Sequence, residues 1–580
     1  MSSEEKTTIS NPPSVREKET FSVDDVEARD AKATAEFDYN STEEQKQQHE
    51  EQNGDDEKKQ SWFGKLYSRF RPLFHLAMFL IFTGYLAAAY ALQVPKGYDQ
   101  EQLILGLIYA FFCLNMLFKY IPFSWITTPM WTTWDFVSKP VYRIPRRWRM
   151  VGFGFLDAVV IIVTIFSIEA ESTRIQRLIA LVGMVIFISG LYITSRHRRS
   201  VNWSTVWSSL LLQFLLALFV FRTSVGQDIF KWLSTFAQGY LGKAWYGIQF
   251  LTNDDVANAG VFAVTVFPAI IFFASTVQIL YYIGALQWML TRFAVIFVHL
   301  LQVSGAEAIV AVASPFIGQG ENALLVKPYL PYMTQAELHQ VMTSGFATIS
   351  GSVLFGYMAM GGVKGEALLT SCIMSIPCSL AVSKLRVPET EEPLTGGKVR
   401  LPPVDPNEKP ANLLHAAGNG ANLGMTIVLC IAANLIALLS LLYAVNAFLT
   451  WAGNFLTIQE LTLQLITGYV FVPIAWMIGA DNENLVDVGR LMALKIWANE
   501  FVAYKEMTTT YDSILTDRSK LVATYALCGF ANLSSIGNQI GCLTVIAPGR
   551  AAELSKLAVS AMLCGAISTW ISACIAGMLG

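Results

Sequence analysis

Long apolar segments recur along most of this 580-residue chain, and they constrain its fold more than any other feature. Each segment is close to the ~20 residues that a helix needs to cross the hydrocarbon core of a bilayer. The chain is 53% hydrophobic and only 15% charged, whereas about a quarter of the residues in an ordinary soluble domain are charged. We therefore predict an all-α polytopic membrane protein. The clearest apolar segments are 72–93, 103–121, 151–168, 178–195, 203–221, 260–283, 341–361, 366–382, 424–449, 520–543 and 557–578.

The first 60 residues differ sharply from the rest of the chain. They contain 17 acidic and 8 basic residues and few large apolar ones, so they cannot bury enough surface to offset chain entropy. We predict a disordered acidic tail, and we expect no signal peptide because no apolar run follows Met1. Basic residues precede the first apolar segment and fill the loops after the second and the fourth. Because cytoplasmic loops are enriched in Lys and Arg, the N-terminus is predicted to be cytoplasmic.

Motifs for metal and nucleotide chemistry are missing from the sequence. The eight cysteines form no CxxC pair, the six histidines form no HExxH motif, and no GxxxxGK[ST] loop occurs. These patterns are the usual signatures of zinc sites, metalloproteases and phosphate-binding loops. We therefore expect no metal site, no catalytic residues, no cofactor and no nucleic-acid partner, and we do not expect an enzyme.

One pattern occurs twice within the apolar segments. Residues 345–352 (GFATISGS) resemble residues 529–536 (GFANLSSI). Each copy follows an acidic residue that lies among small or amide residues, Glu321 in GQGEN and Glu500 in ANE. Two matching halves with polar interruptions inside apolar helices are typical of a secondary transporter, in which the opened backbone forms a binding site near the membrane midplane.

Glu321 and Glu500 are the main evidence for a site. A carboxylate deep in an apolar segment costs at least ~2.5 kcal/mol on insertion scales, so it usually faces a substrate or ion path. The alternative is that each acid only pairs with a nearby lysine, such as Lys327 or Lys505. Because each acid belongs to the repeated pattern, we favour the functional interpretation.

The residue types around these acids indicate what the site can bind. Carboxylates accept hydrogen bonds, and amide side chains both donate and accept them. Gln319, Asn532 and Ser535 therefore suit a neutral ligand with several hydroxyl groups, together with the two acids. No arginine belongs to the set, which disfavours a phosphate. Nucleosides, sugars and nucleobases all remain open at this point.

At these residues the chain resembles a concentrative nucleoside transporter, with a long acidic tail like that of fungal members. The matching motifs occur in order at 318–330, 345–353, 499–504 and 529–537. The resemblance implies a secondary active symporter that imports nucleosides such as uridine and adenosine across the plasma membrane. It also implies a homotrimer surrounded by lipid, with an inverted-repeat transporter core, two re-entrant hairpins and three extra N-terminal helices. The implied count of 11 spans places the C-terminus outside the cell.

The resemblance also implies how the chain divides into domains. The expected order is a disordered tail 1–64, three N-terminal transmembrane helices in 65–170, scaffold and interfacial helices in 171–303, a first core repeat 304–383 with its hairpin 307–330, a polar linker 384–410, a scaffold helix 411–455, a second core repeat 456–545 with its hairpin 484–507, and a C-terminal transmembrane helix 546–580. The stretches 225–243, 286–303 and 456–480 are expected to lie at or near the membrane surfaces without crossing.

Carried over residue by residue, the resemblance assigns seven substrate-binding residues. The nucleobase side would consist of Gln319, Glu321 and Val353, and the ribose side of Glu500, Asn532 and Ser535, with Phe530 nearby. Three positions depart from the family pattern. Gly320 replaces the usual Thr or Ser, which leaves the base preference open, Asn322-Ala323 replaces the usual Ala-Pro, and Lys327 replaces Arg.

The coupling ion is predicted to be a proton. In sodium-coupled relatives an Asn side chain three residues before a Val carbonyl helps to bind the cation, and here those positions are Ser314 and Ile317. A serine is shorter than an asparagine, which weakens a sodium site, whereas a membrane-embedded Glu500 or Glu321 can carry a proton. The alternative is sodium coupling.

A sodium site would comprise Ser314, Ile317, Thr348 and Ile349.

Two other classes of protein fit the sequence less well. An ion channel needs a symmetric pore lined by rings of carbonyls or charges, which the twofold repeat does not favour. An intramembrane enzyme would need a nucleophile or metal beside the acids, and none stands out.

Overall fold

The computed structural model describes residues 70–93, a few residues between 105 and 116, and residues 146–166, 173–319, 321–359, 363–397, 399, 410–459 and 461–580. The predicted tail 1–64, most of the predicted segment 103–121 and most of the second half of the predicted linker lie outside the described residues. The chain divides into two compact units, Met1–Pro140 and Val141–Gly580, and each is described by itself.

The described part of the first unit is mainly one long helix, α3 (Arg71–Gln93). Phe82 stacks on Phe112 with ring centroids 4.6 Å apart, and Thr83 Oγ1 lies 2.7 Å from Tyr109 OH. The helix therefore packs against the segment that contains these two aromatic residues. Most of its large apolar side chains are exposed, as expected of a helix that faces lipid or other helices.

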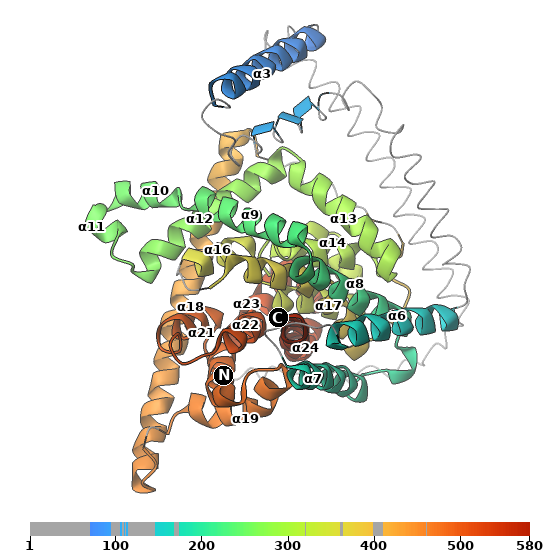
Figure 1. Ribbon diagram of the computed structural model, residues 1–580, viewed down its shortest axis with the longest axis vertical. Coiled ribbons are helices and arrows are strands. Elements are labelled where there is room, and N and C mark those ends of the chain that lie inside the picture. Colours follow the sequence, from blue (N-terminus) through green and yellow to red (C-terminus); the bar gives the residue numbers. More distant parts are fainter. Residues whose placement is uncertain are drawn as a thin grey trace, which may run out of the picture. The chain divides into compact units, whose positions relative to one another are not determined.

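The second unit consists of helices and short 3₁₀ turns, and no strand occurs among its described residues. Over both units, seven described helices are long and apolar enough to cross a membrane (Figure 1). These are α3, α7 (Arg174–Ile193), α8 (Trp203–Arg222), α12 (Phe262–Tyr282), α17 (Gly365–Arg386), α18 (Leu413–Phe455) and α24 (Ala551–Leu579). The predicted all-α polytopic membrane fold is confirmed. The predicted total of 11 spans stays a prediction, because part of the N-terminal region is not described.

Shorter helices occupy the three stretches that were expected to lie at the membrane surfaces, and they are α9 (Ser224–Leu241), α13 (Ala285–Leu301) and α19 (Leu463–Met477). Three further helices, α6 (Arg146–Phe166), α10 (Ala244–Leu251) and α11 (Asp254–Ala257), lie outside those stretches. Left-handed residues flank α13, with φ of 80° at Gly284 and 57° at Gln302. These turns set α13 apart from the helices on either side. Its depth in a membrane stays a prediction.

The two copies of the repeated pattern lie where helices are interrupted. α15 (Gln335–Ala347) is followed after three residues by α16 (Gly351–Ala359), and α22 (Asp517–Leu527) is followed after five by α23 (Leu533–Ile546). The first break lies inside the predicted pattern 345–352, and the second begins one residue before the pattern 529–536 and ends inside it. The opened backbone predicted from the repeat is therefore present in both halves.

The two breaks contact each other directly. The backbone N–H of Phe530 donates to the carbonyl of Thr348 at 3.3 Å. Gly529 has a φ of +100°, and a Cβ there would lie 2.8 Å from the carbonyl oxygen of Phe346. Only glycine combines that backbone conformation with so close an approach. The close contact between the two breaks therefore depends on Gly529, the first residue of the pattern 529–536.

Each half also contains a pair of short helical segments joined by a turn. In the first, α14 (Gly305–Ala313) leads to the 3₁₀ helix η3 (Glu321–Val326), and in the second, α20 (Leu485–Trp497) leads to α21 (Glu500–Thr509). Ser304 and Glu307 form a capping box at the start of α14. Asn499 caps α21 by accepting a hydrogen bond from the backbone N–H of Val502 at 3.1 Å. The turns between the paired helices place polar residues inside the protein.

α24 and α17 lie at the centre of the second unit. In each helix 89% of the apolar window is buried, and α24 packs against α7, α15, α17 and α22 (Figure 1). Both helices are rich in Ala, Ser and Gly, which allow close backbone approach in membranes. Gln213 of α8 adds a polar contact by donating to Ser572 Oγ at 2.9 Å.

α18 is much longer than a single span needs, with 43 residues. It packs against α12 through Gly420 and Gly424, where an added Cβ would lie 2.6 Å from Ala274 O and 2.7 Å from Ile271 Cα. Ser275 Oγ also donates to the carbonyl of Ala417 at 2.9 Å. Only 11% of the apolar window of α18 is buried. Most of this helix therefore faces outward.

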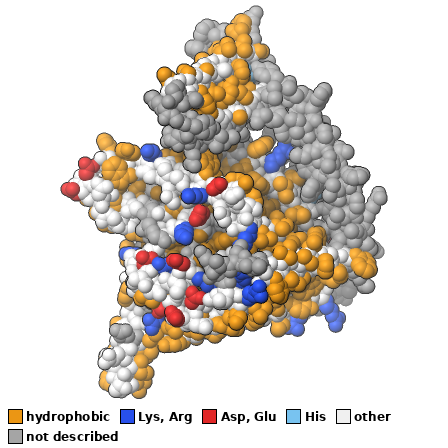
Figure 2. Space-filling model, viewed as in Figure 1, with side chains coloured by type: hydrophobic (Ala, Val, Ile, Leu, Met, Phe, Trp, Pro, Cys, Tyr) orange, Lys and Arg blue, Asp and Glu red, His pale blue; other side chains and the backbone are white. Residues whose placement is uncertain are grey.

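The surface of the second unit separates apolar from charged regions. Figure 2 shows hydrophobic side chains over α7, and charged side chains gathered near the C-terminal end of α24. The exposed apolar residues include Ile175, Leu178, Val182, Val185 and Ile186 of α7. Such a surface needs lipid or other protein around it.

Candidate functional site

A pocket of about 280 Å³ lies between the two helix breaks and α18. Its lining includes six of the seven predicted substrate residues, which are Gln319, Val353, Glu500, Phe530, Asn532 and Ser535. Gln319 and Val353 come from the first half of the repeat, and the other four come from the second. Residues that are up to 216 positions apart in sequence are thus brought together.

Glu500 is the first residue of α21 and is 2% exposed. Its Oε1 accepts a hydrogen bond from Tyr357 OH at 3.0 Å, and its Oε2 accepts one from Asn532 Nδ2 at 2.8 Å. The predicted structural alternative, a pair with Lys505, is not supported, because Lys505 is exposed and is not one of these partners. The carboxylate is fixed by two neutral donors and remains in contact with the pocket.

Asn532 links this acid to the second helix break. As the N-cap of α23, it accepts a hydrogen bond from the backbone N–H of Ser535 at 2.8 Å through Oδ1. Its Nδ2 is then free to donate to Glu500. The motif spacing therefore has a physical basis, because one side chain caps the helix and orients the carboxylate at the same time.

Gln319 links the first half of the repeat to the second. Its side-chain Nε2 donates to the backbone carbonyl of Ser535 at 3.2 Å, and its backbone carbonyl accepts from Gln539 Nε2 at 3.1 Å. Gln319 Oε1 is buried and has no hydrogen-bond partner within the described structure. An unpaired buried acceptor costs about 1–3 kcal/mol. This oxygen is therefore suited to accept a hydrogen bond from a ligand in the pocket.

Glu321, the remaining predicted substrate residue, begins η3. Its side chain lies outside the part of the structure that is described, as does Gly320. Its contact with substrate therefore stays a prediction. Val353 and Phe530 give the pocket an apolar wall beside the polar groups.

Several residues of the site were not predicted from the sequence. Tyr357 contacts Glu500 and lies one helical turn after Val353 on α16, so an i, i+4 search from Val353 would have found it. Asn434 lines the pocket from α18. It is the only polar residue in the run 427–439, and a polar side chain in such a run is itself a signal of function.

The predicted sodium positions lie in the first half of the repeat. Ser314 follows the end of α14 and is 2% exposed; its Oγ donates to Val310 O at 2.8 Å. Thr348 is equally buried, and its Oγ1 donates to Ser344 O at 2.9 Å. Ile317 lies in the turn after α14, and Ile349 lies in the first helix break. All four thus lie at or next to an interruption of a helix.

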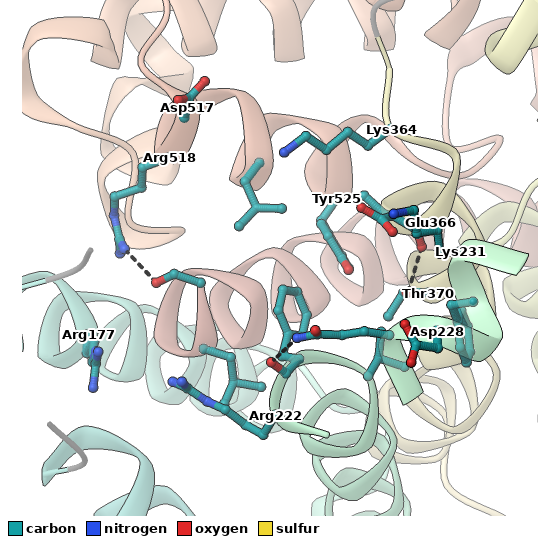
Figure 3. Close-up of a pocket in the computed structure, with 18 residues that line it drawn as sticks. Arg177, Arg222, Asp228, Lys231, Lys364, Glu366, Thr370, Asp517, Arg518 and Tyr525 are labelled. Atoms are coloured by element: carbon teal, nitrogen blue, oxygen red, sulfur yellow. Dashed lines mark hydrogen bonds between the residues drawn. The ribbon is translucent and has the colours of Figure 1, made fainter. Parts of the chain in front are cut away.

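A second and larger cavity of about 950 Å³ lies where α8 ends and α22 begins (Figure 3). Its lining mixes cations such as Arg222, Lys231 and Lys364 with acids such as Asp228 and Glu366. None of the predicted substrate residues lines it. A mixed-charge lining favours water over a neutral ligand, and the smaller pocket is therefore the better candidate.

Comparisons with known protein families agree with this arrangement. Residues 182–255 match the family model described as "Na+ dependent nucleoside transporter N-terminus", and residues 367–577 match its C-terminal counterpart. Residues 263–364, between them, match a model described as "Nucleoside recognition". The three matches cover the whole of the region that holds the pocket.

Individual proteins show the same similarity. "Solute carrier family 28 member 3" of Mus musculus is 36% identical over 460 residues, which is 77% of this chain and 65% of that protein. "Sodium/nucleoside cotransporter 1" of Oryctolagus cuniculus is 38% identical over 422 residues, which is 70% of this chain and 63% of that protein. The chain thus spans less than two thirds of the length of these mammalian relatives. The names of these relatives, a solute carrier and a cotransporter, support the prediction that the chain is not an enzyme.

A solved structure matches the fold. The structure of CNTnw in an inward-facing substrate-bound state has a TM-score of 0.65 and 34% sequence identity. The alignment covers 69% of this chain and 97% of that one. The transporter core is therefore shared nearly in full, and the remaining part of this chain is additional.

Proposed function

Because the chain belongs to the Na⁺ dependent nucleoside transporter family, we propose that it is a secondary active symporter that imports nucleosides such as uridine and adenosine. The membrane is proposed to be the plasma membrane, with the N-terminus inside the cell and the C-terminus outside. The observation that carries the proposal is the pocket between the two helix breaks, with Glu500, Asn532 and Gln319 in its lining.

The chemistry of the pocket supports a nucleoside over a charged metabolite. The Glu500 carboxylate and Asn532 form a hydrogen-bonded pair that suits adjacent hydroxyl groups, such as those of ribose. Gln319 Oε1 is a buried acceptor without a partner among the described residues, and an N–H of a nucleobase could donate a hydrogen bond to it. Val353 and Phe530 offer apolar surface for the flat face of the base. Glu321 is proposed to complete the nucleobase side.

We assign Na⁺ as the coupling ion in this proposal, in place of the proton favoured by the sequence. The proton prediction rested on Ser314 standing where sodium-coupled relatives have Asn. The names of the mammalian relatives support sodium, and nothing in the comparisons supports a proton. Ser314, Ile317, Thr348 and Ile349 are the proposed surroundings of the cation, and the proton carried by Glu500 or Glu321 is the alternative.

A homotrimer is proposed as the working assembly. The main support is α18, whose long apolar face is mostly exposed in the single chain. Exposed apolar residues along it include Leu429, Ile436, Leu441, Phe448 and Trp451. A second chain, together with lipid, would cover this face.

Uptake of radiolabelled uridine into proteoliposomes tests the proposal. We expect accumulation above the equilibrium level when Na⁺ is imposed outside, and only equilibration when Na⁺ is equal on both sides. Accumulation driven by a proton gradient without Na⁺ would restore the proton alternative. Ion current without uridine dependence would indicate a channel, and absence of uridine uptake under every gradient would contradict nucleoside transport.

A further inference from the structure

A buried amide beside Ser314 is not explained by packing or by the substrate pocket. Asn322 is 0% exposed and lies in η3, after the turn that follows α14. Its Nδ2 donates to Ser314 Oγ at 2.8 Å. Asn322 is absent from the lining of the substrate pocket, so its role is separate from that of Gln319.

The hydrogen bonds fix the orientation of this amide. The Ser314 hydroxyl has one hydrogen, which it donates to the carbonyl of Val310 at 2.8 Å. A carbonyl cannot donate, so Ser314 Oγ can only accept from Asn322, and the amide nitrogen must face it. Asn322 Oδ1 therefore points away from Ser314.

The oxygen of this amide is buried, and it accepts no hydrogen bond from any residue that the structure describes. Leaving such an acceptor unpaired costs about 1–3 kcal/mol, and native proteins rarely tolerate it without a ligand, ion or water.

The backbone nearby adds further oxygen atoms. α14 ends at Ala313, and the last carbonyls of a helix carry partial negative charge. Pro315 has no N–H, so the carbonyl of Ala311 cannot accept the usual hydrogen bond from the residue four positions later. The N–H of Phe316 donates to Ala313 O at 2.9 Å, and so it does not make the usual α-helical hydrogen bond to Val312 O. The C-terminal end of α14 thus favours a cation that prefers oxygen ligands.

We propose that Asn322 Oδ1 is a ligand of the co-transported cation and supplies the amide oxygen that Ser314 lacks. The inference rests on the proposed sodium coupling. Ser314 acts as a positioning residue, because its hydroxyl holds the Asn322 amide with the oxygen directed toward the cation. Na⁺ is the cation of suitable chemistry, since the group offers only neutral oxygen atoms.

The test compares two buried amides. Asn322→Leu keeps a side chain of similar size and removes the oxygen. Gln340→Leu is the matched control, because Gln340 is also 0% exposed, donates through Nε2 to a serine hydroxyl at 2.8 Å, and has an unpartnered Oε1. We expect Asn322→Leu to raise the Na⁺ concentration for half-maximal uridine uptake at least about tenfold, and Gln340→Leu to change it by less than about twofold.

Two further variants keep the proposal testable if Asn322→Leu is poorly folded. Ser314→Asn combined with Asn322→Ala moves the amide to the other position, and we expect it to restore most of the Na⁺ affinity that Asn322→Ala alone loses. Asn322→Asp keeps an oxygen at the site and should retain the Na⁺ response. Stabilisation of detergent-solubilised protein by Na⁺ without nucleoside provides a readout apart from transport, and Asn322→Leu should abolish it.

The outcomes separate this inference from the function it rests on. If wild-type uptake depends on Na⁺ and Asn322→Leu has the same Na⁺ requirement, the ligand assignment is wrong and sodium coupling stands. Equal shifts in Asn322→Leu and Gln340→Leu also overturn it, because they would indicate a general packing effect. If uridine uptake by the wild-type protein does not depend on Na⁺, both the proposed sodium coupling and the assignment of Asn322 as a ligand are wrong.

Discussion

At the scale of single residues, the site is organised around Glu500. Both oxygens of its carboxylate accept hydrogen bonds, from Tyr357 OH at 3.0 Å and from Asn532 Nδ2 at 2.8 Å. The carboxylate is thus held rigidly at the start of α21, in contact with a pocket that both halves of the repeat line. Removal of its charge changes every polar contact on the proposed ribose side.

Glu500→Gln is expected to reduce uridine uptake roughly 10- to 100-fold. Hydrogen bonds to charged groups contribute about 1.5–3 kcal/mol each. The glutamine amide has one oxygen where the carboxylate uses two to accept from Tyr357 and Asn532. Uptake at equal surface expression measures the loss, and Glu321→Gln is expected to behave likewise. Lys505→Gln is the control, because this exposed residue is not a partner of Glu500. Normal uptake by both acid variants would contradict the site assignment.

The same residues can be tested by changing the ligand in place of the protein. A nucleoside that lacks the 3′-hydroxyl would leave a buried polar group of the ribose side unpaired, at a cost of about 1–3 kcal/mol. We therefore expect 3′-deoxyuridine to compete with labelled uridine at least about tenfold less well than uridine itself. Equal competition by the two ligands would show that Glu500, Asn532 and Ser535 do not read the ribose.

At the scale of helices, the two breaks are the features that place these residues. The breaks were predictable, because the patterns at 345–352 and 529–536 interrupt apolar segments with Gly, Ser and Asn. The contacts between them were not, since the hydrogen bond from Phe530 to Thr348 joins residues far apart in sequence. Asn322 illustrates the same limit. Its departure from the family pattern is visible in the sequence, but its contact with Ser314 depends on the turn after α14.

Gly529→Ala is expected to disturb the close contact between the two helix breaks. The φ of +100° is strained for any residue with a Cβ, and that atom would lie 2.8 Å from Phe346 O. Such strain costs about 1–3 kcal/mol, so we expect a lower melting temperature in detergent and reduced uptake. Gly537→Ala is the control on the following helix, where a Cβ would meet nothing within 4 Å. If the two variants are equally stable, the close approach at Gly529 is not required.

At the scale of the whole molecule, the sequence predicted the all-α membrane fold from apolar segments alone. It could not predict which helices face outward, because α17, α18 and α24 are all apolar. The structure separates them, since α17 and α24 are central and α18 is mostly exposed. Hydropathy does not distinguish a helix buried in protein from one that faces lipid or another subunit.

The exposed face of α18 leads to a prediction about assembly. We expect native mass spectrometry of the detergent-solubilised protein to give three times the mass of one chain. Charged substitutions on that face, such as Ile436→Glu together with Leu429→Glu, should shift the protein toward the monomer because they place charges in an apolar contact. A wild-type protein that is monomeric at all concentrations would contradict the proposed trimer.

The central claim, nucleoside transport coupled to Na⁺, is tested most directly by uridine-evoked current at fixed voltage. External Na⁺ and external pH are varied independently, with choline as the replacement cation. The proposed function predicts inward current that requires Na⁺, saturates with it and changes little with pH. Current that persists in choline and grows as the external solution is acidified would contradict it, and would return the coupling role to a proton carried by Glu500 or Glu321.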